Sequence, residues 1–157
     1  MRIAVILFTA AAAWLVAVPA RAELVGRVVR VQDGDTLTLL VERREVRVRL
    51  EGIDAPEMGQ PFGRRARESL AELCGARTAR VGELGKDRYG RVLGRIRCGE
   101  IDAAGEQVRR GLAWVYVRYA PPGSPLFDIE REARLAGRGL WSDPAAAAPW
   151  DWRRLRK

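Results

Sequence analysis

The chain has 157 residues, and its 28 lysines and arginines outnumber its 20 aspartates and glutamates, which gives a net charge of +8. This charge is compatible with a polyanionic partner, although only Lys86 and Lys157 are lysines and such an arginine bias can also reflect G+C-rich coding. The chain contains no histidine, which argues against the usual zinc, copper and iron sites.

Residues 1–22 have the pattern of a secretory signal peptide. Arg2 precedes an apolar stretch over residues 3–18, and Ala20-Arg21-Ala22 follows as a small-residue cleavage site. We expect cleavage after Ala22 and export to the periplasm or the medium, with no stable membrane association afterwards. Loss of Arg2 and Arg21 would lower the charge from +8 to +6. The alternative is an uncleaved N-terminal anchor, although the apolar stretch is short for a membrane span.

The remainder predicts one domain and a tail. Residues 23–143 are about the size of a single domain with one modest core, and we expect a monomer. Residues 144–157 form a basic C-terminal tail that contains Trp150 and Trp152 and has no clear period. We expect the tryptophans to dock against the domain and the terminal basic residues to form a frayed end. The alternative is that these basic residues contact nucleic acid weakly.

The first acidic turn of the domain is Asp33-Gly34-Asp35-Thr36. It lies between two strand-like runs, residues 24–31 and 36–41. Gly34 can take a positive φ in such a connection, and the two aspartates then project from the end of a strand.

The next run, residues 45–51, alternates strictly between apolar and charged residues, as a strand with one buried face does. Its apolar residues would face the core, and Arg47 and Arg49 would face outward. The second acidic turn, Ile53-Asp54-Ala55-Pro56-Glu57, follows directly. Its proline forces Ala55 into an extended conformation, so backbone geometry fixes the two carboxylates.

These residues have the chemistry of a hard-cation site beside a phosphate. Carboxylates and backbone carbonyls suit Ca²⁺ or Mg²⁺, and a guanidinium matches phosphate oxygens bidentately without losing its charge. The alternative is a polar turn whose charges are solvated, because Asp-Gly-Asp is also an ordinary hairpin turn.

The middle of the domain predicts a helix and two strands. Residues 61–74 place Phe62, Ala66, Leu70 and Leu73 on one helical stripe, and Gly75 ends the helix. Residues 76–84 form a further strand, and Asp87-Arg88-Tyr89-Gly90-Arg91 opens the next one. In that strand Arg91 shares the outward face with Arg95 and Arg97, so Arg91 can be a second phosphate ligand.

Cys74 and Cys98 are the only cysteines, one at the end of the helix and one on the inward face of a strand. In an exported protein a disulfide between them is the natural interpretation. The alternative is two buried thiols.

The last third of the domain predicts two more helices around an aromatic segment. Asp102 is a candidate N-cap for a helix with Ala104, Val108 and Leu112 on its inner stripe, and a third helix starts at Ser124-Pro125. Its inner stripe would consist of Leu126, Ile129, Ala133 and Ala136. Between the helices, Trp114 and Tyr116 are as compatible with a core as with a binding site, and Tyr119 is the better candidate for a base contact.

Four motifs now carry a family resemblance: Asp33 to Thr36, Arg49-Leu50, Ile53 to Glu57 and Asp87 to Arg91. Their order and spacing resemble those of the thermonuclease family, and of staphylococcal nuclease in particular, over nearly the whole mature chain. The strands and three amphipathic helices indicate an α+β domain. The resemblance implies an OB-fold, a five-stranded β-barrel with three packed α-helices.

The resemblance also implies a function: a calcium-dependent, sugar-nonspecific nuclease that hydrolyses DNA and RNA, favours single-stranded or unpaired regions and leaves 3′-phosphate products. Its Ca²⁺ would be held by Asp35, Asp54 and the main-chain oxygen of Ala55, where the family has threonine. Arg49, Glu57 and Arg91 would be the catalytic residues. Arg88, Tyr89 and Tyr119 would contact the substrate.

Two departures from staphylococcal nuclease concern the surroundings of these residues. The loop 58–63 is shorter, and Arg88 stands where staphylococcal nuclease has lysine. Two other classes of function compete with a nuclease. One is a noncatalytic OB-fold module that binds nucleic acid or protein. The other is an exported adhesion or envelope protein that only binds calcium.

Overall fold

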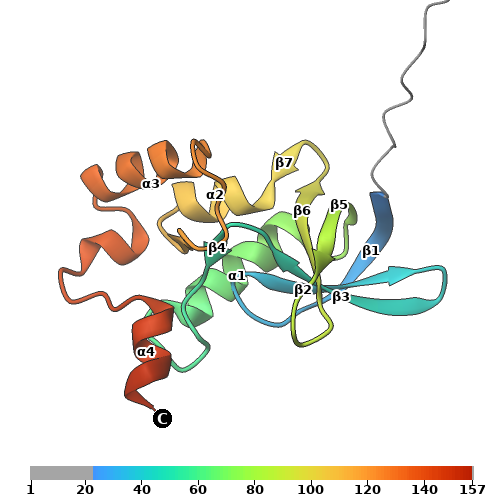
Figure 1. Ribbon diagram of the computed structural model, residues 1–157, viewed down its shortest axis with the longest axis horizontal. Coiled ribbons are helices and arrows are strands. Elements are labelled where there is room, and N and C mark those ends of the chain that lie inside the picture. Colours follow the sequence, from blue (N-terminus) through green and yellow to red (C-terminus); the bar gives the residue numbers. More distant parts are fainter. Residues whose placement is uncertain (1–22, 157) are drawn as a thin grey trace, which may run out of the picture.

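The computed structural model describes residues 23–156. The expected signal peptide, residues 1–22, lies outside the described residues. Figure 1 shows the strands gathered at one side of the molecule and the helices at the other, with α1 between the barrel and the remaining helices. Within residues 23–156, no helix has the length and apolar character needed to cross a membrane.

Five strands close into a barrel. β1 pairs antiparallel with both β2 and β5, β2 pairs with β3, and β5 pairs with β6. A short parallel pairing between β3 and β6 closes the ring. The five strands are β1 (Glu23–Val31), β2 (Thr36–Val41), β3 (Arg44–Leu50), β5 (Thr78–Lys86) and β6 (Val92–Cys98). The OB-fold barrel that the resemblance implied is therefore confirmed.

Three short strands extend this framework. β7 (Ile101–Asp102) pairs with β6, and β4 (Ile53–Asp54) pairs antiparallel with β8 (Trp114–Val115). The β4–β8 pairing joins the second acidic turn to the aromatic segment, which lie about 60 residues apart in the sequence.

The three expected helices are present as α1 (Gly63–Cys74), α2 (Ala103–Arg109) and α3 (Leu126–Leu135). In α1, Ala66, Leu70 and Leu73 are buried in the core, as their spacing predicted. In α3, Ala133 is buried but Ala136 is exposed. Ala136 was wrongly placed on the inner stripe because α3 ends one residue before it.

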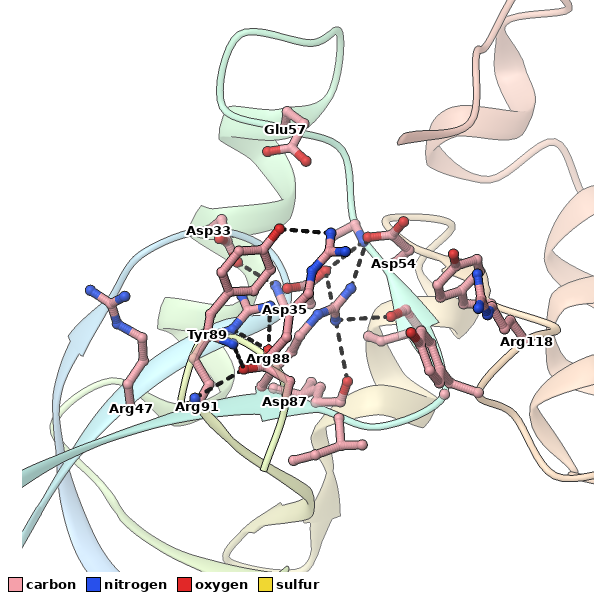
Figure 2. A pocket seen from close by; sticks show the side chains of 18 of the residues that line it. Asp33, Asp35, Arg47, Asp54, Glu57, Asp87, Arg88, Tyr89, Arg91 and Arg118 are labelled. Carbon is pink, nitrogen blue, oxygen red and sulfur yellow. Dashed lines mark hydrogen bonds and ion pairs between the residues drawn. The ribbon is translucent and has the colours of Figure 1, made fainter. Parts of the chain in front are cut away.

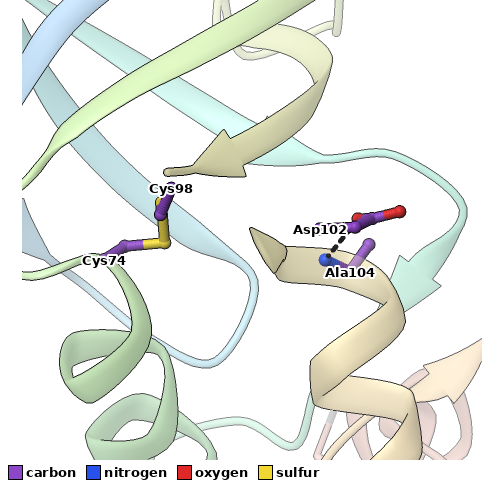
Figure 3. The surroundings of a disulfide bond; sticks show 4 residues. All are labelled: Cys74, Cys98, Asp102 and Ala104. Carbon is purple, nitrogen blue, oxygen red and sulfur yellow. Dashed lines mark hydrogen bonds between the residues drawn. A yellow bond between two sulfur atoms is a disulfide. The ribbon is translucent and has the colours of Figure 1, made fainter. Parts of the chain in front are cut away.

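The cysteines form a disulfide, as expected, which joins the end of α1 to the end of β6 across a separation of 24 residues. Figure 3 shows the bond close to the start of α2, where Asp102 accepts the backbone N–H of Ala104 at 3.1 Å. The predicted N-cap of α2 is therefore present. The bond and the cap together fasten both ends of the β6–β7 connection to the helices.

The tail differs from the expectation. Residues Pro149–Leu155 form a fourth helix, α4, which follows a short 3₁₀ helix at Gly139–Ser142. Trp150 stacks on Tyr116 with ring centroids 5.2 Å apart, and the Gln60 side chain donates a hydrogen bond to the carbonyl of Ala147. Trp150 therefore docks against the domain, as expected. The expectation of a frayed end is wrong for Arg153 and Arg154, which lie within this anchored helix.

Candidate active site

A cleft of about 750 Å³ opens at the end of the barrel where the two acidic turns lie. Its lining comes from both acidic turns, the β5–β6 turn, the aromatic segment after β8, and α4. Figure 2 shows Asp33, Asp35, Asp54, Asp87, Arg88 and Arg91 gathered in the middle of this cleft, with Glu57 on the loop above them and with Arg47 and Arg118 apart at its two sides.

Arg49 lies at the centre of the charged cluster. Its Nη1 is 3.3 Å from Asp35 Oδ2 and donates to the carbonyl of Ile53 at 3.0 Å, and its Nη2 donates to Asp54 Oδ1 at 2.9 Å. The pairing of β2 with β3 sets Arg49 opposite Thr36, which places its side chain beside the first acidic turn. The structure therefore brings Asp35, Arg49 and Asp54 together, as the resemblance implied.

The first turn is braced from several directions. Asp35 accepts the hydroxyl of Thr36 at 2.9 Å and the backbone N–H of Ala55 at 2.8 Å, so its carboxylate ties the two acidic turns together. Asp33 accepts the backbone N–H of Asp35 at 3.0 Å, as a residue that secures the turn would.

The expectation that Gly34 takes a positive φ is wrong, because the φ angle of Gly34 is not positive. A Cβ on Gly34 would lie 2.5 Å from the Cβ of Ala66 in α1, so the glycine is required by close packing. Gln107, fully buried in α2, donates to the carbonyls of both Gly34 and Ala66, at 2.7 and 2.9 Å. Sequence analysis missed Gln107, since a single glutamine within a helix gives no local indication of a contact 73 residues away.

The carboxylates of the cluster crowd one another. Burial, and then the charge of Asp35, raise the pKa of Asp33 to about 6. Burial also raises the pKa of Asp54, and Asp35 adds to this rise against the opposing effect of the arginines. Negative charge is therefore concentrated where a cation would relieve it.

The donor set is suited to a hard divalent cation. Asp35 and Asp54 supply buried carboxylates, and the backbone N–H of Ala55 donates to Asp35, which holds Ala55 beside the first turn. Over residues 23–156, no group of three or more histidine, cysteine, aspartate or glutamate side chains converges as a closed metal cage. Two carboxylates with one carbonyl leave positions for water and substrate oxygens, which suits a hard cation of flexible coordination.

Arg91 approaches the cluster from the β5–β6 turn. Asp87 Oδ2 accepts its Nε and lies near its Nη2, both at 2.7 Å, and Arg91 Nη1 lies 3.3 Å from the hydroxyl of Thr36. Asp87 Oδ1 also accepts the backbone N–H groups of Tyr89 and Arg91. Asp87 therefore positions Arg91. Sequence analysis missed this role, although an aspartate four residues before an arginine in a tight turn suggests it.

The expected substrate contacts lie on the rim of the cleft. Arg88 lies over the ring of Tyr89 at 4.8 Å and donates to its hydroxyl, and Tyr89 is exposed. Tyr119, also exposed, packs edge-on against Tyr116 with the ring centroids 5.0 Å apart. Tyr89 and Tyr119 both line the cleft. Tyr116 also lines it and is half-buried there instead of lying in the core. The rim therefore presents aromatic and cationic groups that suit a nucleotide.

Glu57 stands apart from the Asp35 carboxylate. Its backbone N–H donates to Gln60, and its side chain accepts Nη1 of Arg153 at 2.7 Å. Arg153 Nη2 also binds Asp54 Oδ2 at 2.7 Å, so one guanidinium from α4 joins both carboxylates of the second acidic turn. Sequence analysis missed Arg153. Pro149 at the start of the run and basic residues at its end are helix signals that could have placed it on a helix.

Barrel topology, the acidic turns and the two arginines that line the cleft together define a staphylococcal-nuclease-like domain. The family described as "Staphylococcal nuclease homologue" matches residues 47–143, and the chain belongs to this family.

Individual relatives cover most of the chain. The micrococcal nuclease of Shigella flexneri is 45% identical over 158 residues, which span 94% of this chain and 91% of that protein. Protein ParB of Escherichia coli is 45% identical over 157 residues, or 92% of this chain and 88% of its own length. An uncharacterized endonuclease of E. coli is 42% identical over 134 residues, 84% of this chain and 86% of that protein.

Proposed function

We propose that the protein is an exported, calcium-dependent, sugar-nonspecific nuclease that hydrolyses phosphodiester bonds in DNA and RNA and leaves 3′-phosphate products. The observation that carries the proposal is the convergence of Asp35, Arg49, Asp54 and Arg91 at one end of the barrel. Relatives that cover most of the chain and are named micrococcal nuclease and endonuclease support it.

Asp35, Asp54 and the carbonyl of Ala55 would hold the metal. Calcium bound there supplies positive charge to the phosphoryl oxygens and orders the attacking water. The crowding of the carboxylates favours this occupancy, because a divalent cation removes their mutual repulsion.

Arg49 and Arg91 would bind the scissile phosphate. Each guanidinium has five N–H donors, so it can keep an acidic partner and still donate to a phosphate oxygen. Asp87 holds Arg91 in place, and Asp35 with Asp54 hold Arg49. Donors fixed before the reaction are the ones that stabilise the charge developing in the transition state.

Glu57 would orient the attacking water or take its proton. The water oxygen forms a bond to phosphorus, the bond from phosphorus to the 5′ oxygen breaks, and that oxygen leaves as a hydroxyl after it is protonated. The phosphate remains on the 3′ oxygen of the preceding nucleotide. Glu57 lines the cleft and is partly exposed, so water can reach its carboxylate.

The proposal is tested by cleavage of a fluorescent single-stranded DNA with calcium and then with a chelator, for the parent protein and for Glu57→Gln. We expect calcium-dependent cleavage that falls on the order of 10²- to 10⁴-fold in the variant, the range for loss of a general base. Glu68→Gln is the matched control, because Glu68 is exposed on α1 outside the cleft lining, and it should cleave at the parent rate.

Product ends and substrate class are read in the same assay. A 3′-phosphate blocks extension by a polymerase until a phosphatase removes it, and strands of one sequence as DNA, RNA and duplex report sugar and strand preference. Parent-rate cleavage by Glu57→Gln would show that Glu57 is not the base. Binding without cleavage across several divalent ions would instead indicate a noncatalytic OB-fold module.

A further inference from the structure

Arg153 brings a positive charge from the far end of the chain into the proposed metal site. Its Nη2 lies 2.7 Å from Asp54 Oδ2, and its Nη1 lies 2.7 Å from Glu57 Oε1. Glu57 precedes Arg153 by 96 residues in the sequence. A weaker contact of 3.4 Å joins Nη1 to Asp54 Oδ1. The guanidinium therefore occupies the space between the two acidic groups of the second turn.

Both carboxylate oxygens of Asp54 are engaged by arginines. Arg49 binds Oδ1 at 2.9 Å, and Arg153 binds Oδ2 at 2.7 Å. Asp54 itself is buried, so its carboxylate has little freedom to turn toward another partner. A metal ion that takes Asp54 Oδ2 as a ligand would therefore compete with Arg153 for the space and charge at that oxygen.

Arg153 is the arginine that can leave at lower cost. Arg49 lies within a barrel strand and also binds Asp35 and the Ile53 carbonyl, so its displacement would break several buried contacts. Arg153 is about half exposed on a terminal helix, and its side chain can return to water when it leaves the carboxylates.

The helix that carries Arg153 is held by other contacts. Trp150 stacks on Tyr116, and the carbonyl of Ala147 accepts the Gln60 side chain. The guanidinium is thereby kept at high effective concentration beside Asp54, whether or not it is bound there.

We propose that Arg153 is an intramolecular competitor of the metal ion: in the metal-free protein it neutralises Asp54 and Glu57, and it must yield Asp54 before calcium binds. This inference rests on the metal site of the proposed function. Competition of this kind keeps the carboxylates paired without metal and sets the calcium concentration at which the site fills. Arg153 lies outside residues 47–143, the part of the chain that the family matches, because α4 follows that part.

Calorimetric titration of calcium into the metal-free protein tests the competition without any substrate. We expect Arg153→Ala to lower the dissociation constant for calcium by about 5- to 100-fold, the range typical of coupled binding. Arg153→Lys should fall between the two, because an ammonium is a point charge and cannot span both carboxylates as a planar fork does. Arg154→Ala is the matched control and should bind like the parent, since Arg154 is exposed and pairs with Asp151 in the same helix.

Equal or weaker calcium binding by Arg153→Ala would overturn the inference. If that variant does not fold, as judged by circular dichroism, Arg153→Lys decides in its place, and parent affinity there would overturn the inference as well. Absence of calcium binding by every protein in the set would reject the calcium assignment and the competition together. Calcium-dependent cleavage with unchanged affinity in Arg153→Ala would reject only the competition.

Discussion

The two walls of the cleft are built in different ways. On the barrel wall, the side chains of Arg49, Asp35 and Asp54 are only 15%, 8% and 2% exposed, and strand pairing sets their positions. On the α4 wall, Arg153 and Glu57 are 43% and 42% exposed. The helix behind Arg153 has only seven residues and is held by a few side-chain contacts.

This contrast separates a rigid function from an adjustable one. Groups fixed by register and burial are suited to present the same geometry to metal and phosphate in every cycle. Groups on a short, lightly anchored helix open at lower free energy than the barrel does, and they are suited to respond to the ion. The barrel wall would therefore hold the metal and the phosphate, and Arg153 on the α4 wall would control access to the carboxylates, while Glu57 acts on the attacking water.

Among changes to the barrel wall, Arg49→Ala should have the largest effect, because it removes the central group of that wall. We expect kcat/KM on single-stranded DNA to fall by about 10²- to 10³-fold, which corresponds to roughly 2.7 to 4 kcal/mol of transition-state stabilisation. The metal-free variant should also unfold more easily, since buried Asp35 loses its arginine partner and buried Asp54 keeps only Arg153, and calcium should restore much of that stability.

Arg47→Ala is the matched control for this prediction. Arg47 lies two residues earlier on the same face of β3, at the edge of the cleft. Its loss should reduce kcat/KM by less than about tenfold, mostly through a weaker, salt-sensitive attraction to the substrate. Equal losses in the two variants would mean that the central position of Arg49 carries no special role.

Replacing both Cys74 and Cys98 with alanine should weaken the scaffold without altering the cleft. The disulfide joins cysteines that are 24 residues apart in the sequence. Its loss should reduce the free energy of unfolding by about 3 kcal/mol, measured by urea denaturation. Reduction of the parent protein should produce a similar loss, which controls for packing of the new alanines. A loss of cleavage at 25 °C in the folded variant would show that the barrel wall depends on this bond more closely than its distance from the cleft suggests.

Asp87→Asn should have a smaller effect on activity, because it weakens the support of one phosphate ligand. An amide keeps one hydrogen bond to Arg91 but loses the ion pair, so we expect kcat/KM to fall about tenfold, or roughly 1.4 kcal/mol. Glu51→Gln is the control: it breaks a pair with Arg95, whose side chain is 69% exposed, and it should change activity little.

The same substitution has a pH signature in stability. Burial opposes the charge of Asp87, but hydrogen bonds from Arg91 outweigh it and hold the pKa of Asp87 below its usual range. A lowered pKa in the folded state stabilises the protein above the unfolded pKa, near pH 4, and this stabilisation is lost as the pH falls through the folded value. The difference in unfolding free energy between parent and Asp87→Asn should therefore be constant above about pH 5 and shrink below pH 4. A difference that persists in acid would mean that the carboxylate charge is not its source.

Much of the barrel wall could be predicted from local patterns. Strict alternation over residues 45–51 assigns Arg49 to the outward face, and an acidic turn between two strands places Asp35 at the same barrel end. Residue types alone then indicate the chemistry. The contact between Arg49 and Asp35 depends on strand register, which no local pattern specifies, and the family resemblance supplied that step.

The α4 wall could not be predicted in this way. Its helix is too short to show an apolar period, and it is stabilised by Tyr116, 34 residues earlier. The contacts of Arg153 span 96 and 99 residues, so no local pattern distinguishes the terminal basic residues from a frayed end. The conformation of Gly34 was misjudged for a related reason, since the constraint on it comes from Ala66 in α1 and not from its own turn.

Trp150→Ala should have the smallest effect and should be confined to the α4 wall. The substitution removes the stack on Tyr116, and such aromatic pairs contribute about 0.5 to 1.5 kcal/mol beyond the area they bury. Amide hydrogens of residues 149–155 should then exchange up to about tenfold faster, while those of the barrel strands keep their parent rates. Leu155→Ala is the control, because Leu155 is exposed at the end of the same helix. Faster exchange in the barrel as well would show that the two walls unfold as one unit, and the α4 wall could then not act as a separate, adjustable part of the site.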